Sequence, residues 1–254
     1  LHFADLDGDG DDDFCVRASS NVLCGLSDGS SFTTRAWLAP ALAPAERFAD
    51  GADPSWAQPS YRNTIHLVDL DADGDADLCG RYVDGIYCAL SDGSTFGTPS
   101  RWSDGFSDAG GWADGPGYWG TISFADVDGD GDADVCGRGA RNLVCDLSNG
   151  IDAFENRSTW TMELSDEAGF GSPQSWATIH FPDIDSDGDA DLCARNGDGI
   201  GCARSNGVDG FGSFAPWSTE FPGMDGETTR WASESWYRTI RFPVVEPGTC
   251  ERAR

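Results

Sequence analysis

Aspartates at alternate positions are the residues of this chain best placed to do chemistry. The acidic run Asp5 to Asp13 returns three more times, starting at Asp69, Asp126 and Asp183. Alternate residues of a tight loop can direct carboxylates toward one point, and Ca²⁺ takes roughly six to eight oxygen ligands. We expect about four calcium sites built from positions 1, 3, 5 and 9 of each run. These positions are Asp5, Asp7, Asp9 and Asp13; Asp69, Asp71, Asp73 and Asp77; Asp126, Asp128, Asp130 and Asp134; Asp183, Asp185, Asp187 and Asp191.

The residues between and after the aspartates indicate which type of metal-binding loop this is. A glycine follows position 5 of each run, where the loop must turn sharply: Gly10, Gly74, Gly131 and Gly188. Position 12 is Val16 in the first run and Gly80 in the second, so the bidentate glutamate of an EF-hand is missing and that motif is excluded. One such run could be a solvated acidic turn, but four copies with the same spacing favour metal binding. Four carboxylates leave little room for a substrate, which favours a structural ion over a catalytic one.

Cysteines supply the second recurring pattern. Eight of the nine form pairs with the same spacing: Cys15 and Cys24, Cys79 and Cys88, Cys136 and Cys145, Cys193 and Cys202. Opposed positions on a hairpin can bring two sulfurs within bonding distance, so we predict a cross-strand disulfide in each repeat. A zinc site would need closer cysteines or nearby histidines. Cys250 is left over as a free thiol, a result of where the sequence was cut, or half of a bridge to another chain.

Composition limits the environment and the partners. The 254 residues carry 44 acidic and 16 basic side chains, and the net charge of −28 repels nucleic acids and anionic lipids. No segment is long and apolar enough to cross a membrane. The many cysteines indicate an oxidising setting, which means the extracellular space or the cell surface.

The elements around these motifs repeat in the same order. The acidic runs begin 64, 57 and 57 residues apart, which gives units of approximately 1–60, 61–117, 118–174 and 175–235. Each unit reads as a strand before the acidic run, a strand starting Cys-x-Arg, a strand ending in Cys, and a fourth strand with Phe and Trp. Helical periodicity is absent. We predict an all-β chain in which 1–254 form one β-propeller domain with four blades of four antiparallel strands.

The repeated Asp-x-Asp-x-Asp-Gly-x-x-Asp pattern between short strands resembles the FG-GAP and VCBS repeats of calcium-binding β-propellers. That resemblance implies an extracellular protein of the kind found in integrin heads, secreted lectins and adhesins. The chain departs from many relatives, which have about seven blades, and each unit here adds a cysteine pair. Four blades can also close a ring, and 254 residues cannot supply seven blades of this length.

Other residues recur at strand positions. His2, His66 and His180 share one position, and we interpret them as strand residues rather than catalytic bases. The same interpretation applies to the arginine two residues after the first cysteine of each unit: Arg17, Arg81, Arg138 and Arg195. Residues 236–254 begin a fifth unit without an acidic run, so they either close the ring or continue into a neighbouring module.

Four aromatic residues in Gly-, Ser- and Asp-rich loops leave two interpretations open. Trp56, Trp112, Phe170 and Trp231 would stack on sugar rings if exposed, and would pack in the core if buried. Asn156 begins an Asn-Arg-Ser glycosylation sequon, which is meaningful only in a secreted protein.

Together these patterns predict a non-enzymatic extracellular module, stabilised by calcium, with a structural or adhesive role. Its expected partners are copies of itself or adjacent propeller modules, serially linked into a surface filament. The alternative function is that of a secreted lectin that binds carbohydrate through the aromatic loops between blades.

Overall fold

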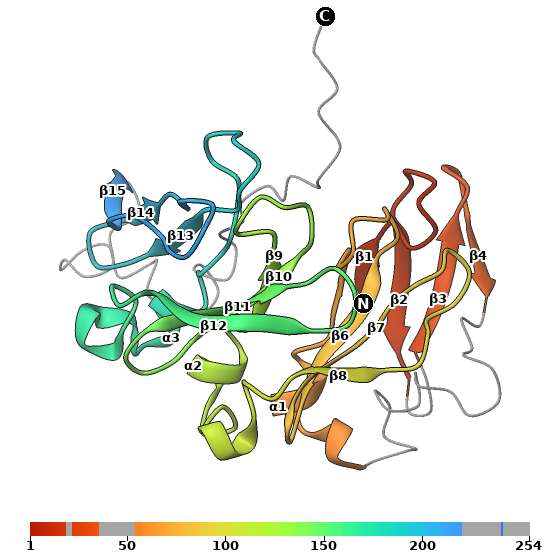
Figure 1. Ribbon diagram of the computed structural model, residues 1–254, viewed down its shortest axis with the longest axis horizontal. Helices are drawn as coiled ribbons and strands as arrows, with labels where there is room; N and C mark the ends of the chain where they lie inside the picture. The colour runs from red at the N-terminus through yellow and green to blue at the C-terminus, as the bar shows by residue number, and fades with distance from the viewer. Residues whose placement is uncertain (19–21, 36–53, 220–239, 241–254) are drawn as a thin grey trace, which may run out of the picture.

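The computed structural model describes residues 1–18, 22–35, 54–219 and 240, and these residues form four antiparallel sheets (Figure 1). The first sheet contains β1 (His2–Ala4), β2 (Asp13–Arg17), β3 (Val22–Ser27) and β4 (Phe32–Arg35). The second contains β5 (His66–Val68), β6 (Asp77–Tyr82), β7 (Gly85–Ala89) and β8 (Ser100–Ser103). The third contains β9 (Ser123–Ala125), β10 (Asp134–Arg138), β11 (Leu143–Ser148) and β12 (Phe154–Thr161). The order of strands in each sheet follows the sequence, as predicted.

The fourth sheet has three strands, β13 (Leu192–Arg195), β14 (Ile200–Ala203) and β15 (Ala215–Ser218). The expected first strand is reduced to one bridge between His180 and Cys193. Pro182 explains the difference, because its oxygen accepts a hydrogen bond from the Asp191 amide but proline has no N–H to return one.

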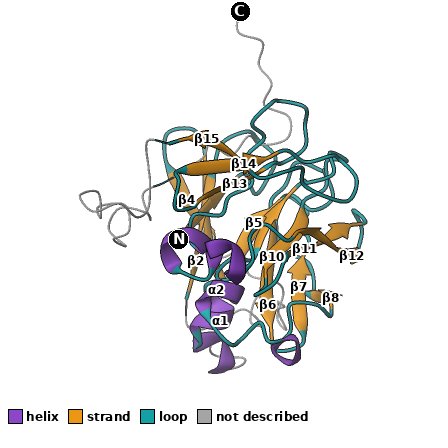
Figure 2. Ribbon diagram, turned by 90° about the vertical axis from the view of Figure 1, so that its left-hand side faces the viewer, coloured by secondary structure: helices purple, strands orange, loops and turns teal. Residues whose placement is uncertain are grey.

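Short helical turns precede the second, third and fourth sheets. They are η2 (Pro54–Ala57) with α1 (Pro59–Arg62), η3 (Asp108–Gly110) with α2 (Pro116–Trp119), and η4 (Asp166–Phe170) with α3 (Pro173–Trp176). Each α-helix begins with a proline, whose fixed φ suits the first turn of a helix. Helices of four residues show no periodicity in a sequence, so the absence of helical periodicity gave no sign of them. Figure 2 shows α1 and α2 next to each other, in agreement with their contact in the structure.

The apolar core lies between successive sheets. Leu78 of β6 packs in a cluster with Leu6 and Cys15 from the first unit, whereas its neighbour Cys79 packs with Val135 and Phe154 of the third sheet. Alternate residues of a strand face opposite sides, so each inner sheet contributes to two cores. In addition, β1 contacts β5 and β5 contacts β9. Successive sheets are therefore stacked face to face, with their first strands adjacent.

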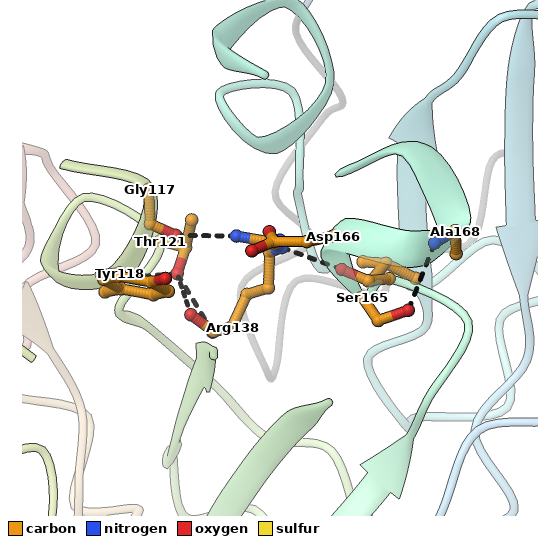
Figure 3. A network of polar contacts seen from close by, with 8 residues as sticks. Gly117, Tyr118, Thr121, Arg138, Ser165, Asp166 and Ala168 are labelled. Atoms are coloured by element: carbon orange, nitrogen blue, oxygen red, sulfur yellow. Dashed lines mark hydrogen bonds and ion pairs between the residues drawn. The ribbon is translucent and has the colours of Figure 1, made fainter. Parts of the chain in front are cut away.

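Buried arginines hold the second strand of a unit to the segments before and after its sheet. Arg138 on β10 donates from Nε to the oxygen of Leu164 at 2.7 Å and from a terminal nitrogen to the oxygen of Gly117 at 3.1 Å (Figure 3). Its other terminal nitrogen pairs with Asp166. Arg81 repeats this arrangement with Phe106, Ser60 and Asp108. The strand placement predicted for Arg17, Arg81, Arg138 and Arg195 is confirmed. The histidines also lie at strand or bridge positions.

Candidate metal centres

Three of the four predicted carboxylates come together in every acidic loop. Ligand oxygens from positions 1, 3 and 9 all lie within 4.8 Å of one another in each loop. The triads are Asp5, Asp7 and Asp13; Asp69, Asp71 and Asp77; Asp126, Asp128 and Asp134; Asp183, Asp185 and Asp191. The glycine at position 6 has φ of 91 to 103° in the four loops, a conformation that favours glycine.

The aspartate at position 5 does not join this cluster. Asp9, Asp73, Asp130 and Asp187 are exposed. In the third loop, Oδ1 of Asp130 accepts a hydrogen bond from the amide of Asp132 at 3.0 Å, and the other loops repeat this contact. An aspartate that bonds an amide two residues ahead stabilises a turn. Position 5 thus shapes the loop, and in the second and third loops its charge adds to burial in raising the pKa of the adjacent position 3 carboxylate, so its role as a metal ligand stays a prediction.

The aspartate at position 9 is buried and fixed on both oxygens. Oδ2 of Asp134 accepts from the Val127 amide at 2.9 Å, and Oδ1 accepts from the Ser148 amide at 2.7 Å. Equivalent bonds hold Asp13, Asp77 and Asp191. This residue joins the start of the loop to the turn after the third strand, so the cluster has a fixed geometry.

Several carboxylate oxygens in the clusters lack a hydrogen-bond donor. Oδ1 of Asp7, Asp71 and Asp128 at position 3, and Oδ1 of Asp69, are buried with no partner among the described residues. Buried polar atoms normally have a partner, so these oxygens are available to coordinate a cation. All donors are carboxylate oxygens, the type that suits hard cations such as Ca²⁺ and Mg²⁺ rather than zinc or copper. The residues therefore fit a hard divalent cation.

The fourth loop differs from the other three. Asp185 at position 3 forms an ion pair with Nε of Arg204 at 3.1 Å. Leucine occupies the position of Arg204 in the other units: Leu26, Leu90 and Leu147. The guanidinium supplies positive charge to a carboxylate that a metal would otherwise neutralise.

Burial makes the charged form of several loop carboxylates unfavourable. It raises the pKa of Asp77 and of Asp134 to about 8. The hydrogen bonds that backbone amides donate to these carboxylates lower the pKa, but by less than burial raises it. Burial, with the charge of Asp130 as the next cause, raises the pKa of Asp128 to about 6. A divalent cation would offset this charge, which couples its binding to folding.

Each of the first three loops is bonded to the next unit. The amide of Ala133 donates to the oxygen of Asp69 at 3.2 Å, and Ser148 Oγ donates to the oxygen of Leu70 at 3.2 Å. The first and second units, and the third and fourth units, repeat both bonds. A cation that fixes one loop therefore also fixes the edge on which the following sheet rests.

Each predicted cysteine pair forms a disulfide: Cys15–Cys24, Cys79–Cys88, Cys136–Cys145 and Cys193–Cys202. The partners are directly opposed on adjacent strands in all four sheets. Cys250 lies outside the described residues. Four disulfides fit an oxidising, extracellular environment, and within the described part of the chain no helix has the length and apolar character needed to cross a membrane.

The predicted sugar-stacking aromatics are core residues. Trp56, Phe170 and Trp112 are 0%, 1% and 8% exposed, so none presents a ring face to a ligand. Trp112, for example, packs on Phe106 with ring centroids 4.6 Å apart, and both rings lie over Gly137 of β10. The carbohydrate interpretation was therefore wrong for these three residues. Trp231 lies outside the described residues.

A cavity of about 390 Å³ lies between the second and third sheets. Its lining residues are Arg101, Trp102, Ser103, Asp104, Asp146, Phe154, Glu155, Asn156 and Arg157. Asp146 is buried and accepts from Arg157 Nε at 2.6 Å and from Ser103 Oγ at 2.7 Å. The Arg157 guanidinium also lies 4.3 Å from the centroid of the Phe106 ring.

The sequence analysis missed this polar group, although the repeat contains a signal for it. Asp146 stands where the other units have small residues, Gly25, Ala89 and Ala203. Arg157 stands where the fourth unit has Phe214. A charged pair that replaces Ala and Phe at equivalent positions marks a departure from the common packing.

The sequence matches no family model and no curated protein. The structure is similar to that of an Agrocybe aegerita lectin that recognises non-reducing terminal N-acetylglucosamine. The TM-score is 0.70 at 23% sequence identity, over 87% of this chain and 52% of the lectin chain. It is also similar to part of the Photorhabdus luminescens Tc holotoxin pore, with a TM-score of 0.54 at 17% identity over 87% of this chain and 10% of that one.

At these identities the similarity shows a shared fold, and the chain spans about half of the lectin and a tenth of the toxin chain.

Proposed function

We propose that this chain is a non-enzymatic extracellular module of the β-propeller type, in which calcium ions fix the edges of successive blades. Its role is structural or adhesive. The observation that carries the proposal is the fourfold recurrence of an all-oxygen aspartate triad, with the first three of these loops bonded to the unit that follows. The stacked sheets with adjacent first strands support a radial arrangement of blades.

Calcium removal tests this proposal. We expect a chelator to lower the melting temperature strongly. A ligand at 100 times its Kd adds about 2.7 kcal/mol per site to the free energy of unfolding, and chelation removes this contribution. Differential scanning calorimetry should show recovery when Ca²⁺ is restored. Magnesium should restore less, since Mg²⁺ demands near-octahedral geometry and keeps several waters. An unchanged melting temperature after chelation would refute the calcium role.

Carbohydrate binding is the second candidate function, and the cavity between the second and third sheets favours it. The cavity offers donors on Arg101, Arg157 and Asn156 and acceptors on Asp104 and Glu155. Sugar hydroxyls both donate and accept, and binding sites usually place a few polar groups over an apolar wall. Trp102 and Phe154 lie behind the cavity with ring centroids 5.3 Å apart, and because they are only 4% and 6% exposed, the polar groups carry the recognition. The lectin function of the similar Agrocybe aegerita protein adds support.

The repeat itself supplies the variant for a glycan array. Replacing Asp146 with Ala, Arg157 with Phe and Val144 with Gly copies the fourth unit, where Phe214 lies over Gly201, so the variant should fold without a buried unpaired charge. We expect it to lose binding to glycans, including those with terminal N-acetylglucosamine, while its melting temperature stays near that of the wild type. Asp152→Asn, on an exposed turn, is the matched control. If the wild type binds no glycan, this candidate fails and the calcium-stabilised module is unaffected.

A further inference from the structure

A positive charge of the chain itself accompanies the fourth aspartate triad. In the first three loops the position 3 residue is Asp7, Asp71 or Asp128, and its Oδ1 is buried without a donor among the described residues. In the fourth loop it is Asp185, whose Oδ2 lies 3.1 Å from Nε of Arg204. Asp185 also contributes an oxygen to its triad. The guanidinium therefore lies next to a carboxylate that the triad offers to a metal.

Arg204 takes the place of an apolar residue of the repeat. The equivalent residues of the other units, Leu26, Leu90 and Leu147, pack against the core clusters beside their loops. The Arg204 side chain is 60% exposed instead, so its guanidinium lies at the surface of the loop. The fourth unit thus has a positive charge where the others have packing, and this charge is close to one loop alone.

Backbone hydrogen bonds hold Arg204 beside the triad. The amide of the next residue, Ser205, donates to Oδ1 of Asp191 at 2.7 Å, and Asp191 is the position 9 aspartate of the same triad. The oxygen of Arg204 accepts from the Gly212 amide at 2.8 Å. Because the chain is bonded at both of these points, the guanidinium stays within reach of Asp185.

We propose that Arg204 makes the fourth loop a weaker calcium site than the other three, so that calcium fills this loop last. An ion that enters the fourth loop either displaces the guanidinium from Asp185 or binds near it and is repelled by its positive charge, and both reduce affinity. Solvent screens the exposed guanidinium, so the effect is moderate, with a Kd about tenfold higher. The chain then responds to calcium in two steps, and between them Arg204 partly offsets the charge of the fourth loop.

This inference rests on the proposed calcium role, and a calcium titration that resolves each loop tests it. Hydrogen exchange with mass spectrometry at stepped free Ca²⁺ concentrations reads the loops separately. We expect residues 5–13, 69–77 and 126–134 to become protected over one concentration range. Residues 183–191 should become protected at a concentration about tenfold higher.

The repeat supplies the variants. Arg204→Leu copies the other units and should bring the fourth loop to the calcium midpoint of the others. Arg204→Lys keeps the positive charge and should leave the fourth loop weak. Arg141→Leu is the matched control, since it removes an exposed arginine from the turn between β10 and β11, and it should behave as the wild type does.

The reciprocal change, Leu147→Arg, places an arginine beside the third loop and should raise the calcium midpoint of residues 126–134 about tenfold. Melting curves in saturating calcium establish which variants are folded, and Arg204→Leu decides the question if Leu147→Arg is not. One shared midpoint for all four loops of the wild type, or a fourth-loop midpoint that Arg204→Leu leaves unchanged, overturns the inference while calcium binding stands. A protein in which no loop responds to Ca²⁺ contradicts the proposed calcium role itself, and the inference falls with it.

Discussion

Aspartates that look alike in the sequence have different surroundings in the acidic loops. Asp128 has a buried Oδ1 without a donor, Asp134 is held by two backbone amides, and Asp130 is exposed and caps a turn. Alternation along the loop predicted that all of these residues would bind the metal. These differences arise within one tight loop that turns at Gly131, where φ is 100°, so neighbouring aspartates meet different backbone amides.

Asp128→Asn should therefore remove one calcium site, whereas Asp130→Asn should retain it with weaker binding. The first change deletes a charge from the triad itself, and the second removes a charge beside the triad and alters an exposed turn. Isothermal titration calorimetry counts the sites in each variant. Equal loss of sites in the two variants would contradict the assignment of position 3 as ligand and position 5 as turn.

His66 makes stability depend on pH. Burial, with a smaller contribution from the charge of His2, lowers its pKa from the ordinary 6.5 to about 4. Between pH 6.5 and about pH 4 the histidine is protonated in the unfolded chain but neutral in the folded chain. The free energy of unfolding therefore falls as the pH drops from about 7 to about 4. The shift corresponds to a loss of up to about 3 kcal/mol.

His66→Ser should flatten this part of the profile, because serine occupies the equivalent position at Ser123. Urea unfolding at pH 7 and pH 4.5 gives the difference, with the wild type as reference. A variant whose stability falls as steeply as that of the wild type would show that other groups cause the acid sensitivity.

At the scale of elements, the buried arginines explain how single-turn helices become fixed. Helix α2 has only four residues, too few to be stable alone. Arg138 donates to the Gly117 oxygen in this helix, and Thr121 Oγ1 donates to Tyr118 while it accepts from the Arg138 amide. The sequence placed Arg138 on a strand but gave no sign of this network.

Arg138→Lys should destabilise the protein by about 1–3 kcal/mol, because an ammonium lacks the planar fork that reaches three acceptors at once and leaves buried carbonyls unpaired. The exposed Arg141→Lys is the control, expected to stay within about 0.5 kcal/mol of the wild type. Chemical denaturation measures both. Equal stabilities for the two variants would mean that the Arg138 contacts contribute little.

At the scale of the whole molecule, stability is distributed along a stack. Each core cluster joins neighbouring units, and Ile240 at the start of the fifth segment packs beside Ile200, Cys193 and Cys202 of the fourth sheet. In such a linear arrangement, stability is approximately the sum of the units and of the interfaces between neighbours.

Trp160→Ala should consequently separate the unfolding of the fourth sheet from that of the others and lower stability by about 3–5 kcal/mol. Trp217→Ala should change the stability of the monomer by no more than about 0.5 kcal/mol, because half of that side chain is already in water. Hydrogen exchange resolves the sheets individually. Uniform loss of protection across all four sheets in Trp160→Ala would contradict the additive picture.

Local features could be predicted from the amino-acid sequence: four units, their antiparallel strands, the disulfides and the acidic loops. Each of these depends on residues close together in the chain, such as the opposed Cys136 and Cys145, so spacing is sufficient to predict them. Which side chains are covered could not be predicted in this way, because burial depends on the neighbouring sheet. Stacking of successive sheets buried Trp56 and Trp112, paired Asp146 with Arg157, and left Phe32 and Trp217 exposed at the two ends.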